Sequence, residues 1–63
     1  MKTIRQARKD AGFTQADMAR LLGTSLVSYG KWENGKTKIS ARDFINFCFI
    51  TGDDLTSIIL PST

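Results

Sequence analysis

The 63-residue sequence predicts an all-α fold, with five short helices in one compact bundle. Proline occurs only at Pro61, so the strongest helix breaker is absent from the segment that would form the bundle. Four of the five glycines follow an apolar segment with helical spacing, where a helix C-cap favours glycine. No useful length of the chain shows the alternation of apolar and polar residues that is typical of a half-buried strand.

The first two helices are predicted from their apolar spacing and their caps. The first is expected over Thr3–Ala11, with its apolar residues on one face and Gly12 after its end. Thr14 and Asp17 then have the spacing of a capping box, with Asp in place of the usual Glu. A second helix is therefore expected to begin at Gln15.

The later helices have start signals of the same kind. Ser25 caps a third helix that ends before Gly35, and Ser40 caps a fourth that ends before Gly52. A fifth short helix is expected from about Asp54 to Leu60, because its two acids would lie at the positive end of the helix dipole. The residues expected to face the core are Ile4, Ala7, Ala11, Met18, Ala19, Leu22, Tyr29, Trp32, Phe44, Phe47, Cys48 and Thr51.

The second and third helices are joined by three residues only, Gly23-Thr24-Ser25. So tight a joint requires a small residue in the preceding helix, which Ala19 supplies, and a joint residue that tolerates positive φ, which is Gly23. Tyr29 and Trp32 then return ring side chains to the core. This spacing is typical of a helix-turn-helix, whose second helix enters the major groove of DNA.

Charge and composition narrow the possible functions. All nine Lys and Arg and four of the six acids lie in residues 1–52, which carry +5, whereas residues 53–63 carry −2. A basic body favours a polyanion partner, nucleic acid or an acidic membrane surface, although a solvated basic surface has the same charge. The chain has no histidine and one cysteine, Cys48, which is expected in the core. We therefore expect a non-enzymatic protein of a reducing compartment, with no metal site and no cofactor.

Neither a membrane span nor a signal peptide is expected. No apolar run approaches the ~18 residues that a membrane-spanning helix requires. The first ten residues, MKTIRQARKD, lack the apolar core of a signal peptide. The expected location is the cytoplasm.

Three stretches carry a resemblance to a known family. They are IRQARKDAGFTQADMARLLGTS, then KWENGKTK, and then a helix that begins after Ser40 and ends at Gly52. Over residues 4 to about 59 they are similar to the lambda-repressor-like (Cro/C1-type) helix-turn-helix family, and ENGKTK is especially similar to its phage repressors. The resemblance implies a five-helix bundle that binds double-stranded operator DNA as a homodimer, in a bacterial or phage-infected cell and in association with the nucleoid.

Two groups of residues are expected to contact DNA. The first group faces the bases from the second and third helices and consists of Gln15, Leu26, Val27, Ser28 and Lys31. The second group suits phosphate contacts, which set register, and consists of Gln15, Asn34, Lys36, Thr37 and Lys38. Gln15 belongs to both because the family's glutamine at this position bridges a phosphate and the neighbouring recognition side chain.

The sequence departs from the family at Leu26 and Val27, where glutamine, which pairs with adenine through two hydrogen bonds, is common. Neither apolar side chain forms a hydrogen bond, so both would pack on thymine methyl groups. Ser28 and Lys31 would then supply the polar contacts. The same two apolar residues also suit a protein partner. A second hypothesis is therefore a protein-interaction module on the same fold, an antirepressor or an antitoxin component.

Two further positions in the third helix are unusual. Tyr29 stands at a core position where the family carries Val or Ile, and its hydroxyl requires a partner. Gly30 lies inside a helix, where glycine costs about 1 kcal/mol relative to alanine. It either makes room for the Tyr29 ring or lets the backbone approach DNA closely.

The resemblance also implies a structural ion pair and an interface between subunits. Arg8 and Glu33 match family positions that form an ion pair between the first helix and the end of the third. At the C-terminal end, the apolar side chains exceed what one helix face can bury. The residues expected at a dimer interface are Phe49, Ile58, Ile59 and Leu60. Residues 1–63 are expected to form one DNA-binding domain that represses a promoter, with no small-molecule effector and no membrane partner.

Overall fold

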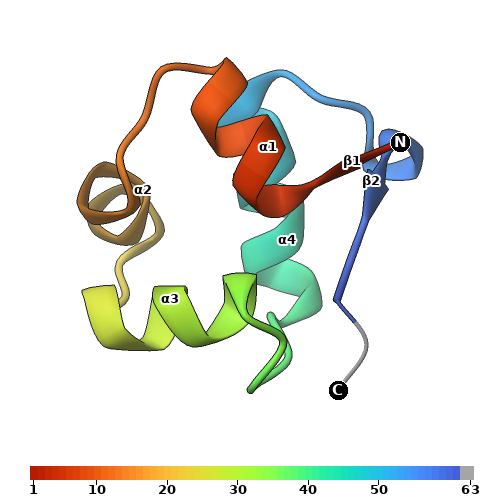
Figure 1. Cartoon of the computed structure of the whole chain (residues 1–63). Helices are drawn as coiled ribbons and strands as arrows, with labels where there is room; N and C mark the ends of the chain where they lie inside the picture. The colour runs from red at the N-terminus through yellow and green to blue at the C-terminus, as the bar shows by residue number, and fades with distance from the viewer. Residues whose placement is uncertain (62–63) are drawn as a thin grey trace.

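The structure is a computed structural model that describes residues 1–61, in which four α-helices pack with one pair of very short strands (Figure 1). In chain order the elements are β1 (Lys2–Thr3), α1 (Ile4–Asp10), α2 (Gln15–Leu22), α3 (Leu26–Glu33), α4 (Ala41–Thr51), a 3-10 turn (Leu55–Ser57) and β2 (Ile58–Ile59). The mostly helical class agrees with the prediction, but the count of five helices does not. No helix within the described residues is long and apolar enough to cross a membrane.

The helices begin where the capping signals predict. Thr14 Oγ1 accepts a hydrogen bond from the backbone N–H of Asp17 at 3.0 Å, and the Asp17 carboxylate accepts one from the Thr14 N–H at 3.0 Å. Ser25 and Ser40 cap α3 and α4 by accepting from the backbone three residues on. Thr3 forms a second capping box at the start of α1, which the sequence analysis missed. The predicted boundaries therefore agree with the four α-helices within about one residue.

The turn between α2 and α3 has the expected geometry. Gly23 has φ 71° and ψ 30°, the left-handed conformation that glycine adopts without strain. Its backbone N–H lies 3.1 Å from the Arg20 carbonyl oxygen and caps the end of α2. Ala19 is buried beneath the turn, and α3 passes below α2 in Figure 1. These two helices form the predicted helix-turn-helix.

One core joins all the elements. Its buried side chains come from every helix and from β2, and they are Ile4, Ala7, Met18, Ala19, Tyr29, Phe47, Cys48 and Ile58. The partly buried side chains that pack against them are Phe13, Leu22, Trp32, Phe44 and Ile50. Of the residues predicted to face the core, Ala11 is wrong, because it is the exposed C-cap of α1. The Tyr29 and Trp32 rings meet edge to face, with centroids 5.9 Å apart.

The predicted fifth helix, from about Asp54 to Leu60, is wrong. Asp54 caps only a 3-10 turn, in which its carboxylate accepts from the Thr56 N–H at 3.0 Å and from the Thr56 hydroxyl at 3.1 Å. Such local bonds offer the backbone an alternative to a helix. The β-branched Ile58 and Ile59 then extend as β2, which pairs in parallel with β1 through the registers Lys2–Ile58 and Thr3–Ile59.

Candidate nucleic-acid interface

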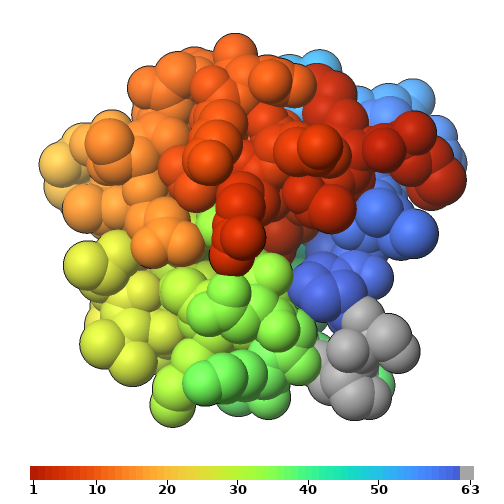
Figure 2. Space-filling view, viewed as in Figure 1, coloured from red at the N-terminus to blue at the C-terminus, as the bar shows by residue number. Residues whose placement is uncertain are grey.

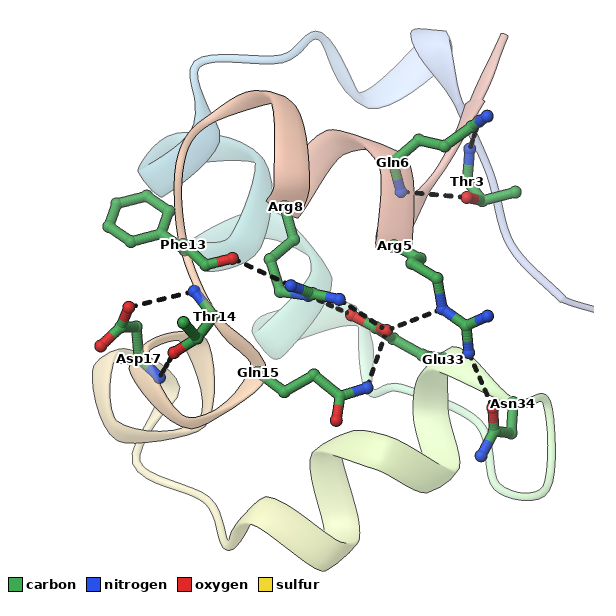
Figure 3. A network of polar contacts seen from close by, with 10 residues as sticks. All are labelled: Thr3, Arg5, Gln6, Arg8, Phe13, Thr14, Gln15, Asp17, Glu33 and Asn34. Atoms are coloured by element: carbon green, nitrogen blue, oxygen red, sulfur yellow. Dashed lines mark hydrogen bonds and ion pairs between the residues drawn. The ribbon is translucent and has the colours of Figure 1, made fainter.

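The last residue of α3, Glu33, lies at the centre of a polar cluster that joins the first three helices (Figure 3). Its carboxylate is inaccessible to solvent, and its Oε2 lies 2.7 Å from Arg8 Nε. The other carboxylate oxygen, Oε1, accepts from Arg8 Nη2 at 3.3 Å. Arg8 Nη1 also donates to the Phe13 carbonyl oxygen at 2.9 Å and so holds the loop before α2. The ion pair that the sequence predicted between α1 and the end of α3 is present.

Two more side chains donate to the same carboxylate. Gln15 Nε2 lies 3.0 Å from Glu33 Oε1, and Arg5 Nε lies 3.2 Å from it. Arg5 Nη2 continues to Asn34 Oδ1 at 2.9 Å. Arg5 was not among the residues predicted from the sequence, although it lies three residues before Arg8 and therefore on the same side of α1. We call Arg5, Arg8, Gln15, Glu33 and Asn34 the Glu33 cluster.

The electrostatics of the Glu33 cluster keep its carboxylate charged. Burial disfavours the ionised form, but the Arg8 guanidinium, the nearby Tyr29 hydroxyl, the Gln15 amide and the Arg5 guanidinium outweigh it and lower the pKa of Glu33 to about 2. The carboxylate therefore remains ionised at neutral pH. It fixes Gln15 at the start of α2 and Asn34 after α3 relative to each other.

The Tyr29 hydroxyl lies in the core beside this cluster. It is buried and has no hydrogen-bond partner among the described residues. Burial raises the pKa of this hydroxyl well above its ordinary value, so it stays protonated. The partner that the sequence analysis required for this hydroxyl is not supplied by the described residues.

The N-terminal half of α3 faces outward. Leu26 is 51% exposed and Val27 is 68% exposed, whereas Tyr29 and Glu33, farther along the helix, are buried. Lys31 is exposed and Ser28 is half-buried. Four of the five residues predicted to face DNA bases thus lie along one short helix, and the fifth, Gln15, is held beside it by Glu33.

The loop after α3 carries the residues predicted to contact phosphates. It begins with Asn34, which Arg5 holds in place, and Lys36, Thr37 and Lys38 are exposed. The Lys36 backbone N–H donates to the Lys31 carbonyl oxygen at 2.9 Å, so the loop stays against the end of the helix. The face shown in Figure 2 brings parts of α1, α2, α3 and this loop together.

Positive charge is unevenly neutralised over the molecule. Five of the nine cationic side chains lie within 4.0 Å of a carboxylate, and they are Lys2, Arg5, Arg8, Arg20 and Arg42. Within the part of the chain that the structure describes, four lysines form no ion pair. Three of these, Lys31, Lys36 and Lys38, lie on α3 or in the loop after it. The uncompensated positive charge is therefore concentrated at the predicted DNA-binding face.

The residues predicted at a dimer interface do not form one surface. Ile58 belongs to the core, with 6% of its surface exposed, because β2 turns it inward. Phe49 is 87% exposed and lines a shallow pocket on α4 with Ile45 and Leu55. Ile59 and Leu60 line a different pocket, together with Arg5 and Glu33. The predicted interface thus divides into two separate apolar regions.

The fold and this surface together define a helix-turn-helix domain with exposed lysines on α3 and in the loop after it. A helix-turn-helix family model matches residues 4–48, which is more than half of the chain. The chain belongs to this Cro/C1-type helix-turn-helix family of DNA-binding transcription regulators, a family that is generally non-enzymatic. Comparisons with curated proteins and with solved structures gave no match. Among residues 1–61 no cluster of His, Cys, Asp and Glu could hold a metal ion.

Proposed function

We propose that the protein represses transcription by occupying a near-palindromic operator as a homodimer, with α3 of each subunit in the major groove. The observation that carries this proposal is the concentration of uncompensated positive charge on Lys31, Lys36 and Lys38, around an outward-facing helix. Cations placed in this way attract the phosphates on both sides of a groove. The protein would act in the cytoplasm, at the nucleoid.

The side chains divide into two roles in this proposal. Leu26, Val27, Ser28 and Lys31 face base edges, and Asn34, Lys36, Thr37 and Lys38 face phosphates. Gln15 serves both. One N–H of its amide is taken by Glu33, which leaves the second N–H for a phosphate and the carbonyl oxygen for a neighbouring donor. The Glu33 cluster would therefore position both the helix start and the loop that contact the DNA backbone.

Ile59 and Leu60 suit the contact between two subunits. They line a pocket with Glu33, so they lie near the end of α3 and its loop. A two-fold axis at this place would bring the two copies of α3 onto one side of the duplex. Recognition helices ~34 Å apart would bind half-sites one helical turn apart. Phe49, in the separate pocket on α4, has no role in this arrangement.

Selection from a random duplex pool at about 0.15 M salt tests the proposal. The salt concentration must be fixed because phosphate contacts make the affinity strongly salt-dependent. A two-fold-symmetric motif with half-sites about 10 base pairs apart is the expected result. Failure of folded protein to enrich any motif would contradict the proposal.

A second candidate function is a protein-interaction module on the same fold, an antirepressor or an antitoxin component. The exposed apolar side chains of Leu26 and Val27 favour it, because surface patches of this kind mark contacts between proteins. The two functions differ in what they require of the lysines. Replacing Lys36 and Lys38 by alanine should weaken DNA binding strongly and spare a contact made by the apolar residues.

A further inference from the structure

We propose that α3 recognises the C5-methyl group of pyrimidines in the major groove, on thymine or on 5-methylcytosine. The surface that does so consists of Leu26, Val27 and Gly30, which we call the α3 apolar strip. This inference rests on the proposed DNA-binding function and adds to it the chemical group that decides which bases are bound.

The three residues form one surface because of their spacing. Gly30 follows Leu26 by four residues and Val27 by three, so all three lie on the same side of α3. Tyr29 and Glu33, which are buried in the core, lie next to Leu26 around the helix and opposite Val27 and Lys31. The strip therefore borders the buried side of α3 at Leu26 and is most exposed at Val27, in the part of the helix that would be inserted into a groove.

The chemistry of the strip restricts what it can recognise. Leu26 and Val27 have no hydrogen-bonding atom in their side chains, yet half or more of each residue is exposed. The apolar group on a base edge in the major groove is the C5-methyl of thymine. Cytosine and uracil lack this methyl group, and 5-methylcytosine carries it on the same carbon. Contact with the strip would remove apolar surface from water on both partners.

Gly30 gives a second, independent indication. Glycine inside a helix is destabilising relative to alanine. Yet Gly30 does not have the positive φ that would require glycine, and a Cβ at its position would meet no atom within 4 Å apart from its chain neighbours and the backbone of its own helix. No packing contact with another element therefore requires glycine here. Because glycine has no side chain, a base edge can approach the helix backbone at this position, between Leu26, Val27 and Lys31.

The polar neighbours of the strip complete the specificity. Ser28 and Lys31 lie beside it, and a lysine ammonium can donate to the O6 and N7 of guanine. A bound half-site would therefore combine C5-methyl groups under Leu26 and Val27 with a guanine within reach of Lys31. Methylation of cytosine in such a site would create a new contact rather than a steric obstacle.

Three random duplex pools test this inference directly. The first contains thymine, the second contains uracil in place of thymine, and the third contains uracil together with 5-methylcytosine. The wild-type protein is expected to enrich a thymine-containing motif from the first pool. In the second pool that motif should bind about fourfold more weakly for each methyl group lost, the factor that corresponds to burying one such group. In the third pool, 5-methylcytosine should replace thymine at the same positions.

The outcomes separate the inference from the proposed function. The same motif with the same affinity in the thymine and uracil pools would overturn methyl recognition and leave DNA binding intact. Enrichment in none of the pools would overturn both.

Three variants and a matched control sharpen the test. Leu26→Ala and Val27→Ala should each remove the preference for thymine over uracil at one position of the half-site. Leu55→Ala is the control, because Leu55 has a similar exposed fraction of 46% but lies outside α3, in the 3-10 turn. It should keep the full preference. Retention of the preference in both Leu26→Ala and Val27→Ala would contradict the assignment of these residues.

Gly30→Ala tests whether the missing side chain at position 30 is needed for a base edge to approach the helix. Apart from its chain neighbours and its own helix backbone, the added methyl group meets no atom within 4 Å, and alanine favours a helix more than glycine does. The variant should therefore fold, and its unfolding temperature should be higher than that of wild type. Its affinity for the selected duplex should nevertheless fall by about tenfold, because the base edge can no longer approach the helix. Unchanged affinity in the stabilised variant would show that Gly30 has no part in recognition.

Discussion

The first turn of α3, Leu26–Ser28, and the rest of the helix differ in what their side chains do. After the first turn, Tyr29 is buried, Trp32 packs against its ring, and Glu33 accepts hydrogen bonds from three side chains of α1 and α2. In the first turn, Leu26 and Val27 are exposed, and Ser25 caps the helix start. One turn of helix thus separates side chains that the fold requires from side chains that it does not.

This difference shows how one short helix can serve two purposes. Tyr29, Trp32 and Glu33 fix the orientation of the helix, because changing any of them disturbs the core or the Glu33 cluster. The exposed positions 26 and 27 can carry many different residues at little cost to stability. In the proposed function, specificity for DNA would therefore change at Leu26 and Val27 without any change in the fold.

The largest expected effect is the loss of the Glu33 charge. Glu33→Gln leaves the Arg8 guanidinium buried without its counterion, so the free energy of unfolding should fall by about 3–5 kcal/mol. Urea denaturation followed by the fluorescence of Trp32, the one tryptophan, measures this.

Two controls belong to this experiment. Arg5→Ala should cost much less, because the Arg5 side chain is half exposed. A double-mutant cycle between Arg8 and Glu33 should show strong coupling. Absence of coupling would mean that the pair does not stabilise the orientation of α3.

The same carboxylate should make stability depend on pH. Folding lowers the pKa of Glu33 from an ordinary value of 4.5 to about 2. Its contribution is therefore present above pH 4.5 and is lost as the pH falls toward 2, by on the order of 2 to 3 kcal/mol. Denaturation curves at several pH values between 5 and 2 should show this loss.

Glu33→Gln provides the reference for the pH series. Asp17, Asp53 and Asp54 also have lowered pKa values, but they titrate in both proteins. The difference between the two series therefore isolates Glu33. Parallel pH dependence in wild type and variant would contradict the assignment.

The next effect concerns binding rather than stability. Lys36→Ala combined with Lys38→Ala should weaken DNA binding by roughly tenfold to a hundredfold on every sequence, and should lower the slope of log K against log salt by about 2. Lys9→Ala is a matched control, because Lys9 is also exposed and unpaired within the described residues but lies on α1. Equal losses in the control would argue against a phosphate-binding loop.

The smallest effect is expected at Tyr29. Tyr29→Phe removes a buried hydroxyl that lacks a partner among the described residues, so stability should stay constant or rise by up to about 1 kcal/mol. The ring and its edge-to-face contact with Trp32 are retained. A marked loss of stability in urea denaturation would show that the hydroxyl contributes to the Glu33 cluster.

Local signals in the sequence predicted the four α-helices well. Thr14, Ser25 and Ser40 mark helix starts because their hydroxyls accept from backbone N–H groups three residues away, and this requires no distant partner. The fifth helix failed for the opposite reason. Whether Ile58 and Ile59 form a helix or a strand depends on β1, more than fifty residues earlier in the chain.

Only part of the candidate site could be predicted from the sequence. The exposure of Val27 and Lys31 follows from helical spacing once Tyr29 is placed in the core, because each lies two residues from it. The hydrogen bonds from Gln15 and Arg5 to Glu33 were not predictable, because they depend on where three helices meet. The sequence also did not show that the predicted dimer interface is divided. That division depends on tertiary structure, because β2 turns Ile58 inward and leaves Ile59 exposed.

By itself, the sequence determined the helix boundaries, the tight turn at Gly23 and the excess of positive charge, because each depends on residues close in the chain or on a simple count. The tertiary structure alone decided which cations remain uncompensated and which apolar residues remain exposed. Arg5 and Arg8 share the carboxylate of Glu33, whereas Lys31, Lys36 and Lys38 form no ion pair within the described residues. The physical reason is that ion pairing and burial depend on distances between segments, which are set only when the core forms.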